Sequence, residues 1–229
     1  MGRGRLRWMV PLAVAVGLVP LAKLAYDAGT GGLGANPIAE GLNRLGFWTL
    51  TLLGASLAAT PAHDLLGLRW PVRLRRALGL LAFSYGVLHF LWYLVLDKFF
   101  AWDEIGKDIA RRKFITVGFV ALLLLVPLAV TSTERWLRRL GYARWKRLHR
   151  LVYVAALLGV IHFVWRVKAD HRKPAIFAVA IGALLLARAI PWARRLRGGR
   201  PSPRGVSGEP GPGSRLARTA AVRTDDARG

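Results

Sequence analysis

Long apolar segments recur along this chain and limit it to one class of fold. About 20 mainly apolar residues cross the hydrocarbon core of a bilayer as a helix. Six stretches meet this requirement, at residues 7–26, 42–60, 76–97, 113–131, 147–168 and 174–193. The hydrophobic content of 54% also fits a soluble globular domain poorly. We therefore predict an all-α membrane protein in which residues 1–197 form a bundle of six transmembrane helices.

Basic residues cluster on alternate connections between these segments. Of the 35 Lys and Arg residues, 24 fall in 1–7, 69–76, 135–150, 188–200 and 201–229. The other connections carry nearly balanced charge, so the positive-inside rule predicts that both termini are cytoplasmic. The net charge of +23 does not indicate nucleic-acid binding, because no basic stripe with interleaved aromatic residues lies outside these clusters.

Three further segments have a distinct composition. Pro61 follows an apolar run, so we expect the second helix to end there. Residues 97–113 alternate aromatic and charged side chains, which is typical of a short amphipathic helix at the membrane interface. Residues 198–229 are rich in Gly, Pro and Arg, and we predict a disordered cytoplasmic tail.

The residue types that are missing restrict the chemistry. Without cysteine the chain cannot form disulfides, iron–sulfur clusters or thiolate-ligated metal sites. It also has no phosphate-binding loop, dinucleotide-binding glycine motif, nucleophile elbow or HExxH motif. The sequence therefore favours a protein that holds a cofactor over one that catalyses with its own side chains.

Two histidines fall at matching depth in two apolar segments. His89 and His162 each lie about 20 Å from the basic end of a predicted helix, and the two helices run in the same direction. One buried imidazole is most simply an interhelical hydrogen-bond donor, but two at equal depth favour bis-histidine ligation of haem iron. We predict that His89 and His162 ligate one haem b.

A third histidine, His149, lies at the basic end of the fifth segment. Thirteen residues of ideal helix put it about 140° around the axis from His162, so the two cannot ligate the same iron. His149 is instead a candidate ligand of a second haem, or a neighbour of a flavin phosphate. The arginines that could bind haem propionates or that phosphate are Arg75, Arg76, Arg147 and Arg150. His63 and His171 lie at the membrane margin and in a loop, where we expect no metal ligation.

Several motifs together resemble one family. They are GGLGANP after the first segment, Thr60-Pro61, RRALGLLAFSYGVLHF, and TSTERWLRRLGYARWKRLHRLVYVAALLGVIHFVWRVK. Over approximately residues 8–192 the chain resembles the MsrQ (YedZ) haem-binding membrane subunits, within the ferric-reductase-like transmembrane superfamily. The family's haem histidines fall on His89, His149 and His162.

The resemblance implies an activity that composition cannot show. Such subunits of the bacterial inner membrane receive electrons from a cytoplasmic flavin reductase or the quinone pool. They pass the electrons through haem b to a periplasmic molybdopterin-dependent methionine sulfoxide reductase, which repairs oxidised envelope proteins and carries out the sulfoxide reduction itself. The resemblance also implies that flavin mononucleotide (FMN) could bind, because some members of the family bind it.

Two alternatives remain at this stage. One is a ferric or oxygen reductase of the same superfamily, which would carry a soluble FAD/NADPH domain. The other is a non-redox transporter or assembly factor in which the histidines only bridge helices.

Overall fold

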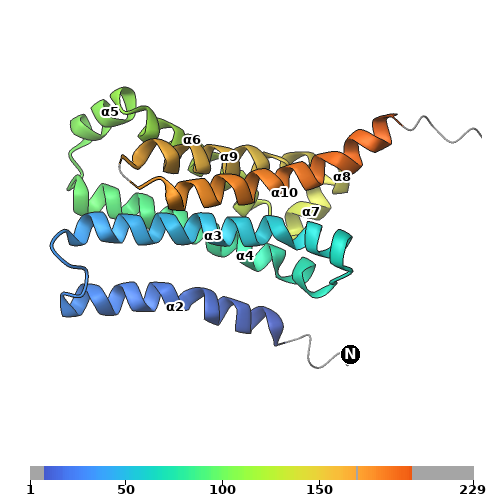
Figure 1. Cartoon of the computed structure of the whole chain (residues 1–229), viewed down its shortest axis with the longest axis horizontal. Coiled ribbons are helices and arrows are strands. Elements are labelled where there is room, and N and C mark those ends of the chain that lie inside the picture. Colours follow the sequence, from blue (N-terminus) through green and yellow to red (C-terminus); the bar gives the residue numbers. More distant parts are fainter. Residues whose placement is uncertain (1–7, 169, 198–229) are drawn as a thin grey trace, which may run out of the picture. The chain divides into compact units, whose positions relative to one another are not determined.

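The computed structural model describes residues 8–168 and 170–197, with side chains as far as Arg188. The described chain is helical and contains no strand (Figure 1). Its elements are α2 (Met9–Thr30), α3 (Pro37–Leu66), α4 (Trp70–Trp92), the short π-helix η1 (Tyr93–Asp97), α5 (Trp102–Arg111), α6 (Lys113–Val130), α7 (Glu134–Leu140), α8 (Tyr142–Leu148), α9 (Leu151–Arg166) and α10 (Arg172–Arg197). Residues up to Pro191 form one compact unit. The predicted tail, 198–229, lies outside the described residues.

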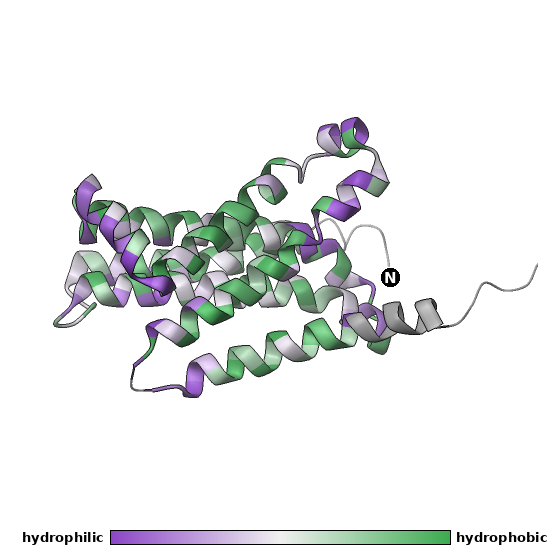
Figure 2. Cartoon of the chain, turned by 90° about the horizontal axis from the view of Figure 1, so that it is seen from above, coloured by the Kyte–Doolittle hydropathy of each residue, from purple (hydrophilic) through white to green (hydrophobic). Residues whose placement is uncertain are grey.

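Five helical segments are long and apolar enough to cross a membrane. They are Met9–Thr30, Pro37–Leu66, Trp70–Asp97, Lys113–Val130 and Tyr142–Arg166. Hydrophobic residues occupy the middle of these helices and hydrophilic residues gather near their ends (Figure 2). The prediction of an all-α, multi-pass membrane protein is thus confirmed for five spans. The sixth predicted span falls in α10, which is helical but is not among the five.

The ends of α3 show how the sequence sets helix boundaries. The Asn36 side chain accepts a hydrogen bond from the Ala39 amide and Pro37 occupies the first turn, a combination that favours helix initiation. We predicted that Pro61 ends this helix, and that prediction is wrong. The helix continues to Leu66 and ends at Gly67, whose φ of 68° suits glycine. Proline is tolerated within membrane helices because neighbouring helices compensate for the lost hydrogen bond.

The compact unit is built on two helix pairs. Helix α3 packs along α4, α6 packs along α9, and α2 lies against α4. Small side chains permit close approach at these interfaces, as Ala82 of α4 and Ala156 of α9 are completely buried. The fully buried Tyr85 donates its hydroxyl hydrogen to the Gly17 carbonyl, 2.7 Å away, and joins α4 to α2. The space between the two pairs contains the candidate site.

The connections divide between two ends of this unit. One end of the unit carries residues 31–36, helix α5 and the start of α10, and it is called the α5 end (Figure 1). The other end carries residues 67–69 and helices α7 and α8, and it is called the α8 end. The short helix predicted within 97–113 is present as α5. Its position is fixed by Lys98, whose ammonium lies 2.9 Å from Asp108, and by buried Ile105.

Candidate functional site

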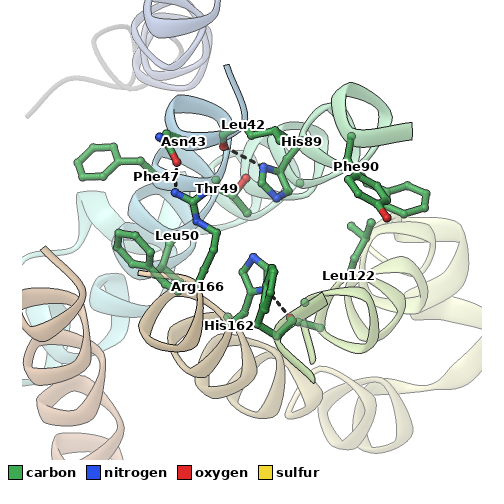
Figure 3. A pocket seen from close by; sticks show the side chains of 18 of the residues that line it. Leu42, Asn43, Phe47, Thr49, Leu50, His89, Phe90, Leu122, His162 and Arg166 are labelled. Atoms are coloured by element: carbon green, nitrogen blue, oxygen red, sulfur yellow. Dashed lines mark hydrogen bonds between the residues drawn. The ribbon is translucent and has the colours of Figure 1, made fainter. Parts of the chain in front are cut away.

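A cavity of about 760 Å³ lies among α3, α4, α6 and α9, and both predicted haem histidines line it. The ring centroids of His89 and His162 are 6.1 Å apart, with ring planes at 85°. The two rings face one another across the cavity (Figure 3). The expectation that these side chains meet from two different helices is therefore correct.

Each of the two imidazoles is held by a backbone carbonyl. His89 Nδ1 lies 3.0 Å from the Leu42 oxygen on α3, and His162 Nδ1 lies 2.6 Å from the Phe114 oxygen on α6. Because a carbonyl can only accept, each Nδ1 carries the hydrogen and each Nε2 keeps its lone pair. The second nitrogen of each ring points toward the space between them (Figure 3). This is the tautomer and orientation that a metal-ligating histidine requires.

Two glycines make room for these rings. A Cβ on Gly46 would lie 3.3 Å from Cε1 of His89, and a Cβ on Gly118 would lie 2.5 Å from Nδ1 of His162. In both cases the glycine is four residues after the carbonyl that accepts the histidine hydrogen bond. A helix carbonyl already accepts from the amide four residues later, so the absence of a side chain there lets a second donor approach.

The dimensions of the site fit a tetrapyrrole-bound iron. Since metal–imidazole bonds are about 2 Å long, two imidazoles bound to opposite sides of one metal have centroids roughly 6 Å apart. The cavity volume is also within the range of cofactor pockets, about 300–1,000 Å³. Among the described residues, no group of three or more His, Asp or Glu side chains is arranged so that it could hold a metal ion. Two imidazoles are the number of protein ligands that a bis-histidine haem iron takes, its other four ligands being porphyrin nitrogens.

The mouth of the cavity at the α5 end carries four basic residues that were not among the cofactor-binding candidates predicted from the sequence. They are Arg44, Arg112, Arg166 and Lys173. Arg166 could have been found from the sequence, because it follows His162 by four residues and so shares its helix face. The guanidinium of Arg166 donates a hydrogen bond to the Asn43 side-chain oxygen.

The predicted third histidine lies at a second, smaller cavity of about 280 Å³. His149 separates α8 from α9 and lines this cavity with Arg75 and Arg76. Its ring stacks on Trp145 at 3.9 Å, and its buried Nε2 has no hydrogen-bond partner in the described part of the chain. His149 and His162 thus line different cavities, as the helical rotation predicted.

The remaining candidates lie outside both cavities. Arg147 and Arg150 are exposed and line neither of the two. His63 is exposed and lies 3.0 Å from the Asp64 carboxylate, and His171 is exposed before α10. His171 thus lies in a connection, as predicted, and His63 lies in the last turn of α3.

Comparison with known proteins places these features in a family. The family described as "Ferric reductase like transmembrane component" matches residues 45–160. The chain is 55% identical to the protein-methionine-sulfoxide reductase heme-binding subunit MsrQ of Rhodospirillum rubrum, over 80% of this chain and 88% of the relative. It is 49% identical to the MsrQ of Caulobacter vibrioides, over 80% and 87% of the two chains. The MsrQ of Deinococcus radiodurans is 50% identical over 79% and 89%.

Proposed function

This chain belongs to the MsrQ family of ferric reductase-like transmembrane proteins, and on that premise we propose that it binds haem b and conducts electrons across the membrane to a methionine sulfoxide reductase. The relatives are named as heme-binding subunits of such a reductase. The observation that carries the proposal is the facing pair of imidazoles, His89 and His162, at 6.1 Å across a large cavity.

The proposed roles of the residues follow from their contacts. A bound haem supplies one-electron transfer at its iron. His89 and His162 would hold the iron through Nε2, while the carbonyls of Leu42 and Phe114 accept the Nδ1 hydrogens and fix both ring orientations. Buried residues such as Leu50 and Leu125 line the same cavity and exclude water.

The direction of transfer is proposed from charge. If the basic α8 end is cytoplasmic, both termini are cytoplasmic and the α5 end faces the periplasm. The haem between His89 and His162 then lies nearer the periplasmic side of the inner membrane, where a molybdopterin-dependent reductase would dock. The donor on the other side would be a cytoplasmic flavin reductase or a quinone. This chain would transfer electrons, and the sulfoxide chemistry would occur on its partner.

The smaller cavity supports a second cofactor less strongly. His149 supplies one unpartnered nitrogen, and Arg75 and Arg76 supply positive charge for propionates or an FMN phosphate. However, the cavity has about one third of the volume of the first, and it contains a single histidine. One haem per chain is the stoichiometry that the two cavities favour.

Absorption spectroscopy of the purified, detergent-solubilised protein tests the main proposal. The wild-type protein should show the Soret band and sharp reduced bands of a low-spin b-type haem. His89→Ala and His162→Ala should each lose the low-spin spectrum, whereas the control His63→Ala should keep it. A folded but colourless wild-type protein would instead support the transporter or assembly-factor alternative, and an unchanged spectrum in both cavity variants would refute the ligand assignment.

A further inference from the structure

Among the described residues, Arg166 at the mouth of the large cavity has no carboxylate within ion-pair distance. We propose that Arg166, oriented by Asn43, binds a carboxylate of the bound tetrapyrrole and thereby sets how the cofactor is seated and how easily it is reduced. This inference rests on the proposed haem function, because it assigns a partner to one edge of the same ligand.

The other arginines at the mouth are already paired. Arg44 contacts the carboxylates of Asp27 and Glu40, and Arg112 lies 3.0 Å from Asp108. In the described part of the chain, no carboxylate lies within ion-pair distance of Arg166. Its side chain is only partly exposed, and a partly desolvated cation without a counter-ion is costly. Glu40, Asp97 and Asp170 also line the cavity, but none of them is within ion-pair distance of Arg166. A carboxylate of a bound ligand would supply the missing counter-charge.

The position of Arg166 matches the iron-binding part of the site. It lies four residues, or about one helical turn, beyond His162, which is about 6 Å along the axis of α9, toward the α5 end. The side chain extends over the cavity beside the two imidazoles and reaches Asn43 on α3 (Figure 3). One helix thus carries an iron ligand and, one turn away, a group suited to an anion.

The hydrogen bond to Asn43 leaves most of the guanidinium free. Arginine has five N–H donors in a planar fork, and a neutral amide oxygen uses one of them without cancelling the charge. The remaining donors suit bidentate binding of a carboxylate. Asn43 is accordingly a positioning residue, which fixes where the fork points. The arginines expected from the sequence to bind propionates, Arg75 and Arg76, line the other cavity.

Two substitutions that each remove one positive charge can distinguish carboxylate binding by Arg166 from a general electrostatic effect. Arg166→Gln removes the group at the mouth, and Lys168→Gln removes a charge two residues away on an exposed side chain that does not line the cavity. Spectroelectrochemical titration of the haem-loaded proteins should give a lower midpoint potential for Arg166→Gln only, since a lost positive charge disfavours the reduced iron. Arg166→Lys should recover part of the difference, and Asn43→Ala should show a smaller decrease.

Replacement of the cofactor tests the carboxylate directly. The full-length protein, depleted of haem, is titrated with iron protoporphyrin IX and with its dimethyl ester, in which the carboxylates are blocked. The wild-type protein should bind the free acid about tenfold more tightly than the ester, the loss expected for one charge-assisted contact. In Arg166→Gln this preference should disappear, whereas Lys168→Gln should retain it.

Three outcomes would overturn the inference. The first is equal binding of the acid and the ester by the wild-type protein. The second is a preference for the acid that persists in Arg166→Gln. The third is a potential that falls by the same amount in acid-loaded and ester-loaded Arg166→Gln, which would assign the arginine to another anion, such as a lipid phosphate. Absence of any haem binding by the wild-type protein would instead refute the proposed function, so the two failures are distinguishable.

Discussion

Gly118 lies so close to His162 that a Cβ built on it would be 2.5 Å from the Nδ1 atom of the imidazole. The same arrangement occurs three times in this fold. A polar side chain of one helix donates a hydrogen bond to a backbone carbonyl of another helix, and the residue four positions after that carbonyl is a glycine. The three donor, carbonyl and glycine sets are His162, Phe114 and Gly118; His89, Leu42 and Gly46; and Ser56, Arg75 and Gly79. Each glycine gives a neighbouring helix access to a backbone acceptor.

Gly118→Ala should therefore displace the His162 ring and break its hydrogen bond to Phe114. We expect a reduced haem content, or a change from low-spin to high-spin haem, measured by absorption spectroscopy and haem quantification per chain. Gly54→Ala is the matched control, because a Cβ there meets nothing within 4 Å and alanine favours the helix by about 0.5–1 kcal/mol. A Gly118→Ala protein with wild-type spectrum and haem content would show that the contact does not position the ligand.

Because His149 and His162 line different cavities, His149→Ala should affect the haem differently from His162→Ala. His149→Ala should leave the low-spin spectrum of the haem between His89 and His162 intact, because His149 lines the other cavity. Haem quantification should give the same amount per chain in the wild-type protein and in His149→Ala if the smaller cavity holds no haem. A loss of about half the haem in His149→Ala, with the low-spin signal retained, would instead assign a second haem to His149.

The hydrogen bond between Tyr85 and Gly17 should contribute measurably to stability. Tyr85→Phe removes a buried hydroxyl that lies 2.7 Å from the Gly17 carbonyl, and we expect the loss of about 1 kcal/mol of unfolding free energy. The loss is modest because the carbonyl keeps its place within α2. Unfolding in detergent can be followed by circular dichroism, with the exposed Tyr26→Phe as the control. Equal unfolding midpoints for the two variants would contradict the assigned role.

The attachment of α5 should weaken in acid. Partial burial raises the pKa of Asp108, but the hydrogen bond and charge of Lys98, the charge of Arg112 and the hydrogen bond from Tyr93 outweigh it, so the pKa lies below 3.8. A carboxylate with a lowered pKa stabilises the folded state above its unfolded pKa, and this contribution is lost as the pH falls through the folded value. The hydrogen bond to Asp108, with the neighbouring charges, raises the pKa of Lys98 above 10.5, so the contribution of Lys98 is lost only at more alkaline pH.

Amide hydrogen exchange over residues 102–111, corrected for its intrinsic pH dependence, can measure this attachment. Protection should be constant between about pH 5 and pH 9 and should fall below about pH 4. Asp108→Asn should lower protection at neutral pH and abolish most of the acid-dependent change. The exposed Asp103→Asn should behave like the wild-type protein. Protection that is independent of acid in the wild-type protein would exclude this ion pair as the anchor.

Much of the candidate site could be predicted because each residue of a membrane helix adds a fixed rise, so the depth of a side chain in the membrane follows from its residue number. His89 and His162 lie equally far along two parallel helices, so counting residues was enough to place them at one level. The same counting separated His149 from His162. The family motifs gave the same three positions. Arg166 was not predicted from the sequence because the clusters of basic residues lie at the α8 end, whereas Arg166 is a single arginine four residues after His162.

Other features depend on neighbours that a linear pattern does not reveal. Pro61 has the local character of a helix end, but α3 continues past it to Gly67. The role of Gly118 is likewise invisible in the sequence of α6, because it is defined by a ring that approaches from α9.

The sequence by itself determined that this protein crosses the membrane as apolar helices and carries two imidazoles at one depth. These properties follow from composition and helical rise, which act residue by residue. Only the tertiary structure decided that the rings face each other across a cavity, that their Nδ1 atoms bind carbonyls four residues before glycines, and that Arg166 has no ion-pair partner among the described residues. The physical reason is that the rotation of each helix about its own axis is set by side-chain packing between helices, and no segment specifies it alone.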